Sequence, residues 1–108
     1  HLPVSILINE GSASASEILA GAIRDNREQV VLVGKKSFGK GSVQELVPVS
    51  RDTSVKITVA HWLTPNGEAI NNIGIAPEVE ISLERDESNL EKDNQLDRAI
   101  EEARKIIE

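Results

Sequence analysis

Short apolar runs flank one amphipathic stretch in the first third of the chain. Val4 to Ile8 is mostly apolar and ends at a polar break, which predicts a short buried strand. Apolar residues then recur at helical spacing from Ser14 to about Arg27, at Ile18, Leu19, Ala22 and Ile23. A second apolar run at 30–33 predicts another buried strand. A strand, a helix and a strand within about thirty residues indicate a right-handed crossover between parallel strands.

In the middle of the chain the spacing of apolar residues changes from helical to every second residue. A loop containing three glycines spans 34–42, and strands are predicted over 43–49 and 54–63 with a turn at 50–53. Val55, Ile57 and Val59 share one face of the later strand, so we expect a hairpin. A turn is predicted at 64–67, an extended return at 73–81 and an amphipathic helix over 93–108.

These elements predict one small α/β domain, for which 108 residues suffice. We expect residues 1–83 to form its body, and residues 84–108 to form a helical segment that packs on the body or extends from it. Phe38 and Trp62 are the only aromatic residues, so the core must consist of Val, Ile, Leu and Ala. The chain enters an apolar strand soon after His1, and we therefore expect it to be a segment of a longer protein.

Composition excludes several classes of function. The net charge of -6 argues against a surface for nucleic acid or anionic membranes. The absence of cysteine excludes disulfides, thiolate catalysis and cysteine-based zinc sites. No apolar run approaches the roughly 18 residues of a membrane span, and no signal-peptide pattern is expected in a segment cut from a longer chain.

The first chemical motif is the serine-rich corner between the first strand and the helix. A serine here can meet a substrate carbonyl, and the N–H groups at the helix start favour a developing oxyanion. The simpler interpretation is that Ser14 caps the helix while Glu17 bonds back to it, because the two residues have capping-box spacing. The residues alone do not choose among Ser12, Ser14 and Ser16.

The second motif is the glycine- and lysine-rich loop at 34–42. Gly34, Gly39 and Lys40 have the spacing of a phosphate-binding loop, which makes nucleotide binding one of two competing interpretations. However, Gly41 stands where a Ser or Thr should hold magnesium, and a strand is predicted where that motif needs a helix. The plainest alternative is a basic loop whose lysines are solvated.

The two motifs can be interpreted together, because a serine nucleophile needs a nearby base. His1 is terminal, and His61 continues the apolar face of its strand, which predicts a residue at the edge of the core. A lysine is the other solution, provided that burial lowers its pKa from about 10.4 to near neutrality. We expect Phe38 and the flanking glycines to place Lys40 in a partly apolar spot, with Lys35 and Lys36 more exposed.

Four ordered blocks of the sequence resemble the carboxyl-terminal processing proteases, also called tail-specific proteases. The resemblance covers nearly the whole chain and includes residues 9–18, 38–44, 63–67 and 74–79, with a further match at 93–96. It implies that Ser14 is the nucleophile, Lys40 its general base and Gln44 the residue that orients the lysine. The backbone N–H of Ala15 would form half of the oxyanion hole, and the other donor would come from a glycine outside this chain.

The spacing departs slightly from the family pattern. Ser14 and Lys40 are 26 positions apart, one more than in the family, and we assign the additional residue to 26–28.

The resemblance implies an α/β core related to the crotonase and Clp protease folds, with a β-α-β crossover, a β-hairpin and a C-terminal amphipathic helix.

The resemblance also implies a function and its setting. The activity would be serine endopeptidase hydrolysis near substrate C-termini through an acyl-enzyme, without a metal or cofactor. The parent would carry a PDZ domain and act outside the cytoplasm, in the bacterial envelope or periplasm. Its substrates would be proteins or peptides with accessible C-termini, and not nucleic acid. A homo-oligomer is compatible with this setting. We expect the 108-residue segment alone to be inactive. A catalytically dead scaffold or binding domain and the nucleotide-binding loop are the alternatives.

Overall fold

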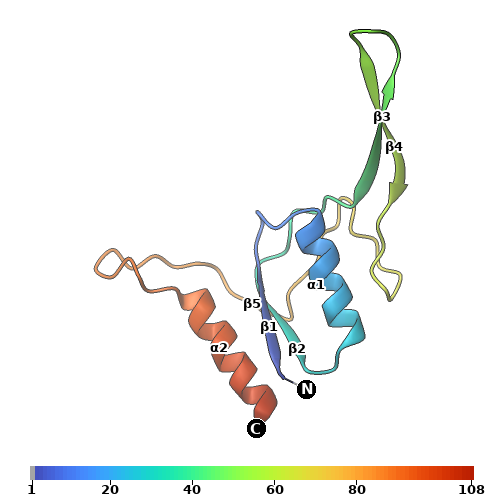
Figure 1. Ribbon diagram of the computed structural model, residues 1–108. Coiled ribbons are helices and arrows are strands. Elements are labelled where there is room, and N and C mark those ends of the chain that lie inside the picture. Colours follow the sequence, from blue (N-terminus) through green and yellow to red (C-terminus); the bar gives the residue numbers. More distant parts are fainter. Residues whose placement is uncertain (1) are drawn as a thin grey trace.

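The computed structural model describes residues 2–108 as a mixed α/β fold (Figure 1). Its elements, in chain order, are β1 (Val4–Ile8), α1 (Ala15–Asn26), β2 (Val30–Gly34), β3 (Ser42–Pro48), β4 (Ser54–His61), β5 (Val79–Glu80) and α2 (Asn94–Ile107). The predicted types and order are confirmed. The prediction for 73–81 is only partly right, because β5 is confined to two residues of that stretch.

The sheet that supports the serine corner is parallel. Its order is β1-β2-β5, and β1 pairs with β2 from Val4 opposite Val30 to Ile8 opposite Gly34. β5 is too short to pair along all of β2, and the Glu78 side chain accepts the Leu32 N–H at 2.6 Å instead. The parallel pairing predicted for the strand–helix–strand unit is therefore confirmed.

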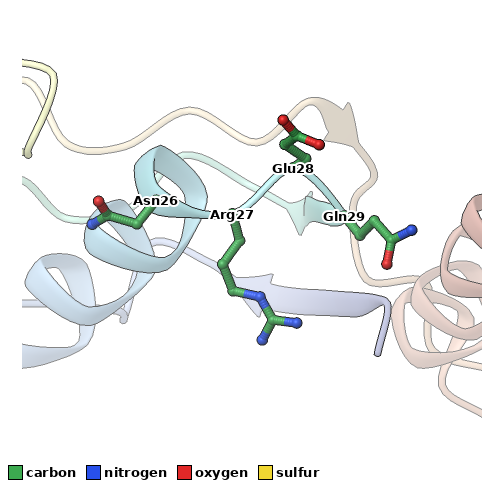
Figure 2. Close-up of a pocket in the computed structure, with 4 residues that line it drawn as sticks. All are labelled: Asn26, Arg27, Glu28 and Gln29. Carbon is green, nitrogen blue, oxygen red and sulfur yellow. The ribbon is translucent and has the colours of Figure 1, made fainter. Parts of the chain in front are cut away.

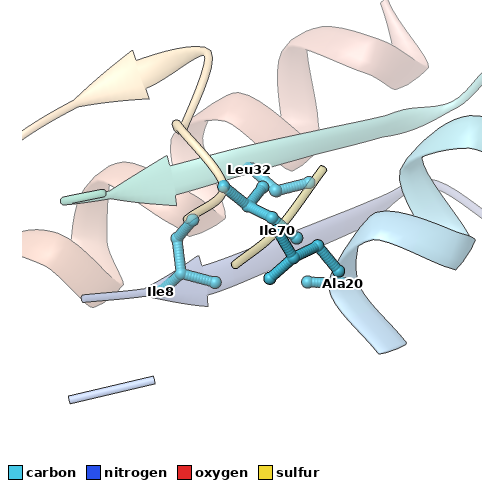
Figure 3. Close-up of a cluster of buried hydrophobic side chains, with 5 residues drawn as sticks. Ile8, Ala20, Leu32 and Ile70 are labelled. Atoms are coloured by element: carbon cyan, nitrogen blue, oxygen red, sulfur yellow. The ribbon is translucent and has the colours of Figure 1, made fainter. Parts of the chain in front are cut away.

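The core lies where the sheet meets the helices, which flank it in Figure 1. On the α1 side, one cluster joins Ile8, Ala20, Leu32, Ile70 and Ile75, four of which are labelled in Figure 3. Alternate strand residues face α2, where the Ser5 hydroxyl donates to the Ala99 carbonyl at 2.7 Å. The predicted core of Val, Ile, Leu and Ala is confirmed.

The buried face of α1 is not centred on the apolar residues that predicted the helix. Glu17, Ala20 and Gly21 are its buried residues, whereas Leu19 is 62% exposed. Close fit explains the difference, since a Cβ added to Gly21 would lie 3.0 Å from a Thr64 methyl carbon. The small Gly21 lets the 64–75 segment approach the helix closely, and the loop at 37–40 covers the Glu17 carboxylate.

The hairpin of β3 and β4 projects away from the body (Figure 1). Its apolar face is open, with Val55, Ile57 and Val59 each about half exposed, between 45% and 54%. The radius of gyration is 17.5 Å, against about 13 Å for a compact domain of roughly this length. His61 is exposed at the end of β4, so its predicted place at the core edge is wrong: every residue of this strand is exposed.

Helix α2 begins at a polar cap and packs on the sheet. The Asp93 carboxylate accepts the Leu96 N–H at 3.0 Å, and the side chains of Asn94 and Gln95 donate to the carbonyls of Ser82 and Ile81. The amphipathic helix predicted here is confirmed. Across residues 2–108, the helices are too short or too polar to cross a membrane.

Candidate active site

Ser14 occupies a strained corner immediately before α1. Its backbone angles are φ 53 and ψ -116, and only one other non-glycine residue between 2 and 108 has a positive φ. Such a conformation costs on the order of 1–3 kcal/mol and persists only where surrounding contacts impose it. Strained backbone of this kind is concentrated at functional sites, which makes Ser14 a candidate functional residue.

The structure distinguishes Ser14 from its two serine neighbours. The Ser12 hydroxyl is engaged, because it accepts the Asn9 N–H at 3.1 Å. Ser16 is exposed in the first turn of α1. The Ser14 hydroxyl makes no side-chain cap hydrogen bond, although Glu17 bonds back to the Ser14 N–H at 3.0 Å as the capping-box spacing predicted.

Ala15 provides a donor beside this hydroxyl. It is the first residue of α1, so its N–H has no acceptor within the helix. The start of a twelve-residue helix also carries partial positive charge. The corner thus pairs a hydroxyl with an N–H group suited to an oxyanion.

The lysine loop alternates between buried and exposed positions. Ser37, Gly39 and Gly41 face the body and are buried, while Phe38, at 68% exposure, and Lys40 face outward. The prediction that Lys40 lies in a partly apolar spot is therefore wrong for this structure.

Glycine is required in this loop because other backbone lies against it. Gly39 has φ 91, and its carbonyl accepts the Asn72 N–H at 2.8 Å. A Cβ at Gly41 would lie 2.6 Å from the Asn71 nitrogen. β3 begins directly afterwards at Ser42, which confirms the predicted strand where a phosphate-binding loop needs a helix.

Glu17 joins the two motifs, and sequence reasoning missed three of its four contacts. Its side chain is 1% exposed. Oε1 accepts the Ser37 hydroxyl at 2.6 Å and the Gly39 N–H at 2.6 Å. Oε2 accepts the Ser14 N–H at 3.0 Å and the Lys40 N–H at 2.9 Å. The capping-box position signalled the bond to Ser14, but no sequence pattern signalled the other three.

The shared acceptor brings the two predicted dyad residues together. Since the backbone nitrogens of Ser14 and Lys40 both contact Oε2 of Glu17, the two residues lie side by side. The Phe38 N–H also donates to the Ser12 carbonyl at 2.9 Å, which ties the same two loops once more.

The side chains are not joined in the same way. No hydrogen bond links the Ser14 hydroxyl to the Lys40 amine within the described residues, and Lys40 forms no ion pair there. Gln44 lies exposed on β3, where its Nε2 contacts the Thr58 hydroxyl at 3.4 Å. The structure therefore brings the backbones of Ser14 and Lys40 together without a bond between their side chains.

The remaining candidates lie away from this corner. His1 is outside the described residues, and His61 is on the hairpin. Figure 2 shows a hollow at the turn after α1, lined by Asn26, Arg27, Glu28 and Gln29. This hollow is at the far end of α1, about 18 Å from Ser14 along the helix axis. It offers no nucleophile.

Acid is expected to destabilise the chain through two buried carboxyl groups. Burial raises the pKa of Glu17, but the hydrogen bonds from Ser37, Gly39, Lys40 and Ser14 outweigh burial and leave the pKa below its usual value. Burial likewise raises the pKa of Asp25, and bonds from Arg24 and the Asn66 N–H lower it further than that.

A carboxyl group whose pKa is lower in the folded chain than in the unfolded chain stabilises the fold at pH values above its ordinary pKa. This contribution is lost as the pH falls through the pKa of the folded state. We expect the free energy of unfolding in urea to drop by about 1 kcal/mol or more between about pH 7 and about pH 3. The Asp25→Asn variant should lose less over the same range. A free energy that is constant or rises on acidification would contradict this linkage.

Comparison with known proteins identifies the family of this chain. The family model described as peptidase family S41 matches residues 1–81. The carboxy-terminal-processing protease of Bartonella bacilliformis is 48% identical over 77 residues, covering 71% of this chain and 18% of that protein. The carboxy-terminal processing protease CtpB of Bacillus subtilis is 49% identical over 79 residues, covering 73% of this chain and 16% of that protein.

A solved structure gives the same result. The photosystem II D1 C-terminal processing protease superposes with a TM-score of 0.69 at 44% identity, over 74% of this chain and 20% of that one. The chain thus spans about a fifth or less of the proteins that it matches. It belongs to peptidase family S41, as a homologue of the carboxyl-terminal processing proteases.

Proposed function

We propose that this chain supplies the nucleophile and the base of a serine endopeptidase of the carboxyl-terminal processing type. The observation that carries the proposal is the single Glu17 oxygen that accepts the N–H groups of both Ser14 and Lys40. It places the only serine of the corner with a positive φ beside a lysine that forms no ion pair within residues 2–108. Family membership makes peptide hydrolysis the reaction that fits this pair.

The proposed reaction uses an acyl-enzyme. Neutral Lys40 takes the hydroxyl proton as Ser14 Oγ attacks the substrate carbonyl carbon, and the Ala15 N–H donates to the resulting oxyanion. The carbon–nitrogen bond then breaks, and Lys40 returns the proton to the leaving amine. Water attacks the ester, and its proton passes through Lys40 as Ser14 is released. In this scheme the dyad itself uses no metal or cofactor.

Two side-chain movements would complete the dyad. Lys40 is exposed, so its amine has to turn toward Ser14 and lose contact with water. Gln44 would orient this amine once it exchanges its 3.4 Å contact with Thr58, which is long enough to be weak. The intact protein would stabilise the closed arrangement and supply the second oxyanion donor, and we expect the 108-residue chain alone to be inactive.

The setting follows from the same family. We propose that the chain works within a longer protein with an α/β core of the crotonase and Clp protease type and a PDZ domain. Its substrates would be proteins or peptides with accessible C-termini, outside the cytoplasm in the bacterial envelope or periplasm. A homo-oligomer is compatible with this proposal.

Labelling by a fluorophosphonate tests the proposed function. The intact protein is expected to form one covalent adduct, which peptide mass spectrometry should map to Ser14. A catalytically dead scaffold would bind peptides without any adduct. An adduct on Ser12 or Ser16 would reject Ser14 as the nucleophile.

A further inference from the structure

Glu17 is a buried anion that is held by hydrogen bonds alone. No lysine or arginine lies within 4.0 Å of its carboxylate among the described residues. A buried charge is costly unless it is fully hydrogen-bonded. The four donors satisfy that requirement, and they come from the serine corner and the lysine loop.

The donor pattern explains why a carboxylate stands at this position. Each of its two oxygens accepts two hydrogen bonds, and a carboxylate presents acceptors only. An amide of the same shape would turn an NH₂ group toward two of these donors. Glu17→Gln therefore preserves size and removes the negative charge together with half of the acceptors.

A third segment is connected through Ser37. Its hydroxyl donates to Glu17 Oε1 and accepts the Ile75 N–H at 2.7 Å, and the whole side chain is buried. Ser37 is therefore a bridge from Glu17 to the 70–75 segment that lies against Gly39. Movement of any one of these three segments would disturb the same carboxylate.

We propose that Glu17 is the positioning residue of the Ser14–Lys40 dyad. Its Oε2 fixes the backbone of both residues against each other, and its Oε1 fixes the loop that carries Lys40. Glu17 itself touches neither substrate nor the transferred proton. This inference rests on the proposed function for its catalytic consequence, although the positioning of the two backbones is testable without catalysis.

The catalytic test measures the rate constant for fluorophosphonate labelling of Ser14 in the intact protein. In Glu17→Gln we expect this rate constant and kcat to fall about 100-fold with little change in KM, as for a misplacement of about 1 Å. Ser37→Ala removes one of the four donors and should cause a smaller loss. A purely structural role would instead reduce the fraction of molecules labelled, leaving the rate constant of the remainder at the wild-type value; that result would overturn the proposal.

Glu78→Gln provides a matched control. It makes the same chemical change at a carboxylate that also accepts a backbone N–H, but from Leu32 in the sheet. We expect wild-type labelling in this variant. An equal loss in Glu78→Gln and Glu17→Gln would show a general effect of carboxylate removal and would reject a special role for Glu17.

Amide hydrogen exchange separates the two proposals. Glu17→Gln should accelerate exchange at Ser14, Gly39 and Lys40 in the intact protein, and Ser37→Ala should do so more weakly if the first variant fails to fold. Unchanged exchange at these amides would reject positioning by Glu17 even in an active enzyme. Faster exchange in a protein that no phosphonate labels would reject the peptidase and retain the positioning.

Discussion

Ser14→Ala is expected to abolish peptide cleavage by the intact protein, lowering kcat/KM by about 10⁴-fold or more. The substitution removes the attacking oxygen and leaves the contacts that shape the corner, because the bonds to Glu17 and from the first turn involve the Ser14 backbone. Circular dichroism should show an unchanged fold. The activity is measured with a peptide whose C-terminus is free.

Three variants control for this result. Ser12→Ala and Ser16→Ala should retain most of the activity, although Ser12→Ala also removes the bond from Asn9. Ser14→Gly should be as inactive as Ser14→Ala, yet more stable by up to about 1 kcal/mol, because glycine adopts a positive φ without strain. Near-normal cleavage by Ser14→Ala or Ser14→Gly would remove Ser14 from the mechanism.

Elements governed by local pattern could be predicted from the sequence. The strand, helix and strand at 4–34 and the helix beginning at Asn94 follow apolar periodicity and cap residues that lie within a few positions of each other. The hairpin follows from alternation on both sides of a short turn. Ser14 stood out because a serine-rich corner precedes a helix, and the family resemblance, not the spacing, selected it from three serines.

Burial could not be predicted in the same way, because it depends on segments that are distant in sequence. Glu17 is buried because the loop at 37–40, at least twenty positions later in the chain, covers its carboxylate. Lys40 and the apolar face of β4 show the opposite outcome, because both are exposed. Alternation of apolar and polar residues identifies a face of a strand, but it does not say whether another segment covers that face. The candidate site thus combines a corner that is visible in the sequence with a carboxylate whose burial only the fold reveals.

This combination bears on how the dyad is held. The strain at Ser14 has to be imposed by contacts, and its N–H bond to Glu17 is one of them. The same oxygen accepts the Lys40 N–H, so in our proposal one buried carboxylate both maintains the corner and sets the distance between the loops. In the proposed mechanism, backbone placement and side-chain closure are separate requirements, and variants can address each one alone.

Lys40→Arg addresses side-chain closure and is expected to lower kcat/KM by about 10⁴-fold, as much as Lys40→Ala. Arginine keeps the positive charge and the length of the side chain but does not deprotonate in a protein, so it cannot accept the proton of Ser14. Only the backbone N–H of residue 40 contacts Glu17 and the side chain is exposed, so unfolding free energy should change by no more than about 0.5 kcal/mol. Unchanged amide exchange at residues 14 and 40 in Lys40→Arg would verify that placement is intact. Cleavage by Lys40→Arg at more than a tenth of the wild-type rate would mean that some other group accepts the proton, and the base would then have to be sought outside this loop.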